Sequence, residues 1–181
     1  MQYKSINQHL KPYSIAARRA TTINHAFASA IAPHDEYDDE KIRAGVKQLG
    51  QNPDEDLRCV YCGSNAETWD HVQATVRNKK FSGFGHRLGN LLPCCKPCNS
   101  RKGNKAWSAY LDAIGTDGLA RRKSLIESYL AQYQQVDLIP ENLPEYEELE
   151  ALRIQVLEIF QKADALAAQI RLKTRRLVEK D

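Results

Sequence analysis

Residues 58–107 read RCVYCGSNAETWDHVQATVRNKKFSGFGHRLGNLLPCCKPCNSRKGNKAW, and they contain every cysteine of the 181-residue chain. The cysteines form two Cys-x-x-Cys pairs and one spare: Cys59 with Cys62, Cys95 with Cys98, and Cys94. One pair alone could be a redox dithiol, but two matched pairs favour four thiolates around one Zn²⁺. A pairing of Cys94 with Cys98 is an alternative, and the matched two-residue spacing favours Cys95. We therefore predict a structural zinc site of Cys59, Cys62, Cys95 and Cys98.

The segment between the two cysteine pairs suggests a small β-hairpin followed by a helix. We expect a strand that ends at Asp70-His71, a basic loop through Lys79 and Lys80, and a return strand around residues 90–92. Pro97 favours the first turn of a helix. That helix would carry an apolar stripe for docking on the hairpin, formed by Trp107, Tyr110, Leu111 and Ile114. The pattern predicts a ββα unit closed by the metal.

Helical patterns flank this unit on both sides. They cover about Ile15–Ala32, Asp38–Leu49, Leu119–Gln134 and Glu145–Glu179, and Pro33 and Gly50 mark two of their ends. We predict an α+β, mostly helical fold in which a zinc-stapled ββα module lies between helical regions. The expected domains are an N-terminal helical region (1–57), the module (58–115) and a C-terminal helical region (116–181).

The last helical pattern carries apolar residues at alternating steps of three and four. They are Leu149, Leu152, Val156, Ile159, Ala163, Leu166 and Ile170. A seam of this length is typical of a coiled coil or of a helix packed on a neighbour. Two interpretations stay open: intramolecular packing on the N-terminal helices, and a homodimer formed through residues 145–179.

The net charge of +3 is unevenly distributed along the chain. Residues 58–107 hold nine basic and two acidic groups, which gives +7, whereas the flanks carry −1 and −3. A localised positive stretch of this kind is expected of a site that binds a polyanion such as nucleic acid. No apolar run approaches the roughly 20 residues of a membrane span, and MQYKSINQHL lacks the apolar core of a signal peptide. We expect a cytoplasmic protein without a membrane partner.

Four motifs occur in order and resemble the HNH family of nucleases, the ββα-metal type with a structural zinc. They are Cys59-x₂-Cys62, Asp70-His71, Gly89-Asn90-Leu91 and Cys95-x₂-Cys98-Asn99-x₂-Lys102. The resemblance spans about residues 59–107, and Asn99 stands where the family often has a second histidine. It implies an endonuclease that hydrolyses phosphodiester bonds, with double-stranded DNA as the expected substrate.

The resemblance also implies a role for each motif residue. His71 would be the general base that activates water. Asp70 and Asn99 would hold one catalytic Mg²⁺ or Mn²⁺ through oxygen ligands, which hard cations prefer. Asn90 would orient the loop that carries His71.

Further basic residues of the stretch are candidates for contact with DNA phosphates. They are Arg101, Lys102, Arg87, Lys79, Lys80 and His86. A restriction or anti-phage role is expected of such a nuclease in a bacterium or phage. Two alternatives remain: a zinc-stabilised nucleic-acid-binding module without catalysis, and an effector nuclease subunit that an unknown partner protein activates.

Overall fold

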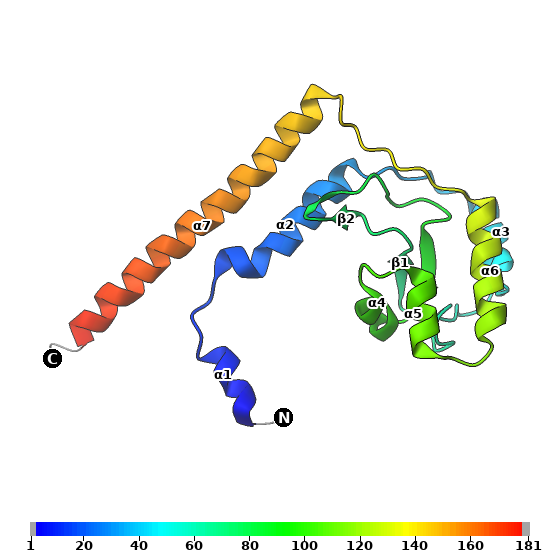
Figure 1. Cartoon of the computed structure of the whole chain (residues 1–181), viewed down its shortest axis with the longest axis horizontal. Coiled ribbons are helices and arrows are strands. Elements are labelled where there is room, and N and C mark those ends of the chain that lie inside the picture. Colours follow the sequence, from blue (N-terminus) through cyan, green and yellow to red (C-terminus); the bar gives the residue numbers. More distant parts are fainter. Residues whose placement is uncertain (1–2, 179–181) are drawn as a thin grey trace. The chain divides into compact units, whose positions relative to one another are not determined.

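The structure is a computed structural model that describes residues 3–178 (Figure 1). A 3₁₀ turn, Tyr3–Ser5, is followed by seven helices and four strands. The helices are α1 (Ile6–His9), α2 (Ile15–Ile31), α3 (Asp39–Gln48), α4 (Lys96–Lys102), α5 (Trp107–Ile114), α6 (Leu119–Gln132) and α7 (Pro144–Val178). The strands are β1 (Thr68–His71), β2 (Val76–Arg77), β3 (Lys80–Phe81) and β4 (Leu91–Cys94). The predicted mostly helical α+β fold is confirmed.

The chain forms two compact units. One contains residues 28–140, and the other joins the chain up to residue 27 with the chain from residue 141 onward. The predicted domain boundaries, after residues 57 and 115, both lie within the first unit. Helices α3 and α6 therefore belong to the same unit as the cysteine-rich segment, and they contact each other there.

The flanking helices begin and end close to the predicted residues. Helix α3 is capped by Asp38, whose carboxylate accepts a hydrogen bond from the Lys41 backbone N–H at 3.0 Å. Gly50 follows α3 with a positive φ of 71°, as a helix C-terminus favours. Helix α7 begins at Pro144, and the predicted last residue, Glu179, lies outside the described residues. Local capping chemistry thus sets these boundaries.

The hairpin of the predicted ββα unit is the antiparallel pair β1 and β4. Asp70 lies opposite Leu92, and His71 lies opposite Leu91. Because strand side chains alternate between faces, Asp70 points into the core with Leu92, and His71 lies on the other face. Helix α4 packs on β1 and completes the unit.

The prediction of one continuous helix from Pro97 through Ile114 is wrong. Helix α4 ends at Lys102 because Gly103 takes a positive φ of 50°, and α5 begins only at Trp107. The apolar stripe therefore lies on α5, where Tyr110 and Leu111 are buried. They join the main core, which also contains Tyr61, Leu92, Ile126 and Tyr129.

The basic segment around Lys79 and Lys80, predicted as a loop, forms the short hairpin of β2 and β3. Its turn residues, Asn78 and Lys79, both have positive φ, as two-residue hairpin turns require. Val76 and Phe81 are buried there with Ala28 and Ala32 of unit 28–140. None of the helices between residues 3 and 178 combines the length and apolar character needed to cross a membrane.

In the other unit, α7 hydrogen-bonds to the beginning of α2. The Asp164 carboxylate accepts from the backbone N–H groups of Ile15 and Ala16 at 2.7 and 3.0 Å. Farther along, the Arg153 guanidinium donates to the Asn24 side chain at 2.8 Å. These contacts fit the intramolecular interpretation of α7. Several heptad positions nevertheless remain exposed: Leu152, Ile159, Leu166 and Ile170.

Candidate metal centre and active site

Four cysteines lie together in unit 28–140. The sulfur atoms of Cys59, Cys62, Cys95 and Cys98 are all within 4.8 Å of one another, and those of Cys62 and Cys95 are 3.7 Å apart. Zn–S bonds of about 2.3 Å in a tetrahedron place two sulfurs about 3.8 Å apart. The cluster therefore fits a metal ion such as zinc, and it contains Cys95 rather than Cys94.

Two local turns present these sulfurs. The Gly63 backbone N–H donates to the Cys59 carbonyl at 2.9 Å, and Gly63 takes a positive φ of 81° to close the first turn. Cys95 is the N-cap residue of α4, and Cys98 lies in its first turn. A bound metal would therefore fix α4 against the 59–62 turn.

Cys94 lies beside the cluster without belonging to it. It is buried at the end of β4, and its sulfur lies 3.9 Å from the Cys59 sulfur, within hydrogen-bond reach of a thiol. This contact lowers the pKa of Cys59 to about 4, whereas the same contact and burial raise the pKa of Cys94. Cys94 therefore contacts Cys59 from outside the four clustered sulfurs.

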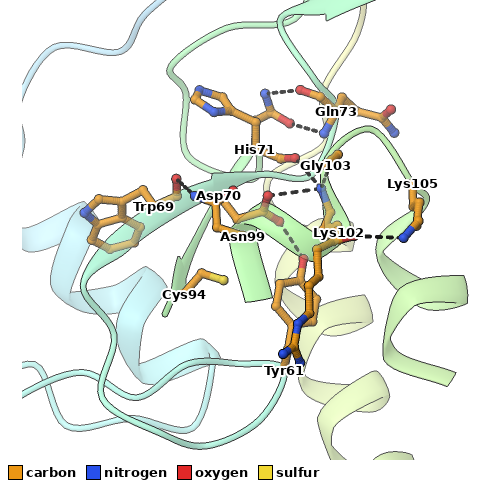
Figure 2. A network of polar contacts seen from close by, with 12 residues as sticks. Tyr61, Trp69, Asp70, His71, Gln73, Cys94, Asn99, Lys102, Gly103 and Lys105 are labelled. Carbon is orange, nitrogen blue, oxygen red and sulfur yellow. Dashed lines mark hydrogen bonds and ion pairs between the residues drawn. The ribbon is translucent and has the colours of Figure 1, made fainter. Parts of the chain in front are cut away.

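A buried polar network surrounds Asp70, as Figure 2 shows. The Tyr61 hydroxyl donates to one Asp70 oxygen at 2.6 Å, and the Lys102 ammonium donates to the other at 3.1 Å. Asp70 is only 3% exposed and Lys102 only 1%. Burial raises the pKa of Asp70, while the Tyr61 hydroxyl and the Lys102 charge act in the opposite direction.

Lys102 also ties the network to the backbone. Its ammonium donates to the carbonyl oxygens of His71 at 2.9 Å and of Gly103 at 3.3 Å. All three ammonium protons thus have an acceptor, which a buried charge requires. Lys102, predicted as a phosphate contact, is instead 1% exposed and engaged by these three acceptors.

Asp70 and Asn99 were expected to share a metal ion. Both oxygens of Asp70 already accept hydrogen bonds, and the Asn99 amide nitrogen points to the Trp69 carbonyl at 3.3 Å and the Thr68 hydroxyl at 3.4 Å. The two side chains therefore do not form an open pair of oxygen ligands in this structure. A cation would have to reach a carboxylate that is buried and already paired with the Lys102 ammonium.

His71 lies on the opposite face of β1 from Asp70 and contacts a second imidazole. His71 Nε2 is 3.0 Å from His86 Nδ1, a hydrogen-bond distance, and the rings meet edge to face with centroids 5.0 Å apart. His71 is half-buried, and His86 is exposed. His86, expected to meet phosphate or support the site, is thus a direct partner of His71.

Asn90 is fully buried next to the segments that carry the two histidines. Its side-chain oxygen accepts from the Gln73 backbone N–H at 2.7 Å, and its amide group donates to the carbonyls of Gln73 at 3.1 Å and Gly85 at 2.8 Å. It thereby ties the segment after His71 to the segment before His86. This geometry gives Asn90 a means of holding both imidazoles in place.

The remaining basic candidates differ in their environments. Lys79, Lys80 and Arg101 are exposed. Arg87 is half-buried and forms an ion pair with Asp35 at 3.0 Å. The first three are therefore open to solvent and to a phosphate backbone, whereas Arg87 already has a carboxylate partner.

Sequence reasoning missed Tyr61 and the partnership of the two histidines. Tyr61 is the second of the two residues between Cys59 and Cys62. The Cys-x-x-Cys spacing gives no role to the residues between the cysteines. The two-residue period of a strand does predict that Asp70 and His71 face opposite sides, so this signal could have separated their roles.

Comparison with family models, with curated proteins and with solved structures finds no match to this chain. The functional assignment therefore depends on the chemistry of the site.

Proposed function

We propose that this protein is an HNH-type endonuclease that hydrolyses phosphodiester bonds in DNA, with His71 as the general base. The observation that carries the proposal is the His71–His86 pair, with its nitrogens 3.0 Å apart on the solvent side of β1. A neighbouring imidazole that is exposed to solvent can transfer the abstracted proton to bulk water. A restriction or anti-phage role would suit this activity.

The proposed chemistry begins with a water molecule aimed at the scissile phosphorus. As the water oxygen bonds to phosphorus, His71 accepts the water proton, the bond from phosphorus to the leaving ester oxygen breaks, and solvent protonates that oxygen. His86 can relay the proton from His71 to solvent because it is exposed. Asn90 positions both rings through its contacts to Gln73 and Gly85. Asp70 acts from the core, where its ion pair with Lys102 fixes β1 against α4.

The family resemblance implies a Mg²⁺ or Mn²⁺ ion on Asp70 and Asn99. These residues do not fit that ion as they stand, since both Asp70 oxygens are engaged by Tyr61 and Lys102. No step of the proposed chemistry passes through such an ion. The four cysteines do fit Zn²⁺, which would serve as a structural staple because all four ligand positions are taken by sulfur.

Charge supports nucleic acid as the substrate. The excess of +7 over residues 58–107 includes the exposed Lys79, Lys80 and Arg101, which can pair with phosphates. The engaged Asp70 carboxylate favours a second candidate, a zinc-stabilised module that binds nucleic acid without cutting it.

The test is cleavage of supercoiled plasmid DNA in Mg²⁺, in Mn²⁺ and in EDTA, with the zinc-loaded protein. His71→Ala should lower the cleavage rate by roughly 10²- to 10⁴-fold, the usual contribution of a general base. His25→Ala, which removes an exposed histidine of α2, is the matched control and should cut at the wild-type rate. DNA binding without cleavage by the wild type would instead support the second candidate, and equal rates for His71→Ala and wild type would refute the role of His71.

A further inference from the structure

A groove of about 910 Å³ opens beside the two histidines, within unit 28–140. Its walls come from the segment 35–42 before and within α3, the segment 86–91 up to the start of β4, and the segment 132–135 at the end of α6. Trp69 of β1 and His86, the partner of His71, are among the lining residues. The groove is large enough for a nucleotide-sized ligand, since small-molecule sites commonly measure about 300–1,000 Å³.

Trp69 is the unusual residue of this groove. It is 45% exposed, although burying the large apolar surface of an indole is favourable. It lies two residues before His71, so the strand period places both rings on one face of β1. The indole is therefore next to the proposed general base and open to a ligand.

The charges of the groove disfavour a phosphate as its occupant. Three carboxylates line it, those of Asp35, Glu36 and Asp38, against the cations of Lys41 and Arg87 and the imidazole of His86. Both cations are already paired: Arg87 with Asp35 at 3.0 Å and Lys41 with Asp38 at 3.3 Å. Carboxylate oxygens can instead accept hydrogen bonds from the N–H groups of a base, such as the ring N–H of thymine, and aromatic faces can stack on it.

We infer that this groove binds one unstacked nucleobase adjacent to the scissile phosphate, with Trp69 as the stacking platform. The inference rests on the proposed nuclease function and adds that the substrate has an unpaired base at the cut site. The strand must present an unpaired base at the cut site, either because it is single-stranded or because one nucleotide leaves the duplex stack. Tyr37, which is 81% exposed on the groove wall, offers a second ring.

The experiment compares two strands of equal length and charge, a 12-nucleotide oligothymidylate and an abasic 12-mer. Full-length zinc-loaded protein carrying His71→Ala is used, so that the strands stay intact during binding. Adding Trp69→Ala should weaken binding of the oligothymidylate by roughly 5- to 150-fold, the range of one base–aromatic stack. Binding of the abasic strand should change by less than about twofold, and Trp69→Phe should retain most of the affinity, because both effects depend on stacking.

Tyr13→Ala provides the matched control, since Tyr13 is an exposed aromatic residue outside the groove. It should leave the affinity for both strands unchanged. Equal weakening of both strands by Trp69→Ala would overturn the inference, as would unchanged affinity for the oligothymidylate.

A second readout does not depend on how well the Trp69 variants fold. The chain has two tryptophans, so Trp107→Phe leaves Trp69 as the only indole reporter. Its fluorescence should be quenched by the oligothymidylate and not by the abasic strand. Cleavage of plasmid DNA without this quenching would overturn the groove inference alone, whereas a wild type that neither binds nor cuts DNA would overturn the proposed function with it.

Discussion

Replacing the buried Lys102 by Met should strongly destabilise unit 28–140. The ammonium is 1% exposed and lies 3.1 Å from an Asp70 oxygen. At an effective dielectric constant of about 20, a pair at this distance attracts by about 5 kcal/mol. Met fills a similar volume, so the change removes the charge and leaves the Asp70 carboxylate buried with only the Tyr61 hydroxyl as a partner.

The expected cost follows from that uncompensated charge. Breaking a buried pair by removing one partner typically costs about 3–5 kcal/mol. For a domain of about 100 residues this lowers the melting temperature by more than about 10 °C. Lys105→Met is the matched control, because Lys105 is exposed and its ammonium donates to the Arg101 carbonyl rather than to a carboxylate. This control should lower the free energy of unfolding by less than about 0.5 kcal/mol.

The assay is urea unfolding at a fixed zinc concentration, run as a double-mutant cycle with Asp70→Asn. Each single variant retains one group of the pair, whereas the double variant leaves neither charge buried. The double variant should therefore be more stable than the sum of the two single effects by at least about 2 kcal/mol. Additive effects, or a loss below about 1 kcal/mol for Lys102→Met, would refute the buried-pair reasoning.

Two further predictions concern the cysteines and α7. Cys95→Ser should lower the bound zinc well below one per chain, whereas Cys94→Ser should keep one zinc per chain, because only Cys95 belongs to the sulfur cluster; equal zinc loss, measured by elemental analysis, would contradict the ligand assignment. We also propose a homodimer through the exposed heptad positions of α7, so Leu152→Glu with Ile159→Glu should yield folded monomers in sedimentation velocity. A wild type that is monomeric at high concentration would exclude that interface.

Much of the fold follows from short-range patterns. The cap at Asp38, the positive φ of Gly50 and the spacing of the cysteine pairs act within a few residues, so the helices flanking the module and the sulfur cluster could be predicted. The break between α4 and α5 was missed, because the apolar stripe after Gly103 keeps a helical period. Periodicity reports which residues share a face and is insensitive to a turn between two helices.

The candidate site also has one part that the sequence indicates and another that depends on the fold. The motif order around His71 and Asn90 is visible in the amino-acid sequence, and it identifies the residues that the structure brings together at β1 and β4. The Lys102–Asp70 ion pair and the His71–His86 contact join residues 32 and 15 positions apart. Such contacts depend on strand register and on the direction in which α4 meets β1.

Sequence alone determined the flanking helices, the hairpin of β1 and β4 and the four clustered cysteines of this protein, because each depends on local backbone preferences or on a fixed spacing. Only the tertiary structure decided that Asp70 is a buried ion-pair partner of Lys102 and that His71 is paired with His86. It also decided that Trp69 borders a groove assembled from three distant segments. The physical reason is that burial, and with it the cost of an unpaired charge, is a property of the packed chain.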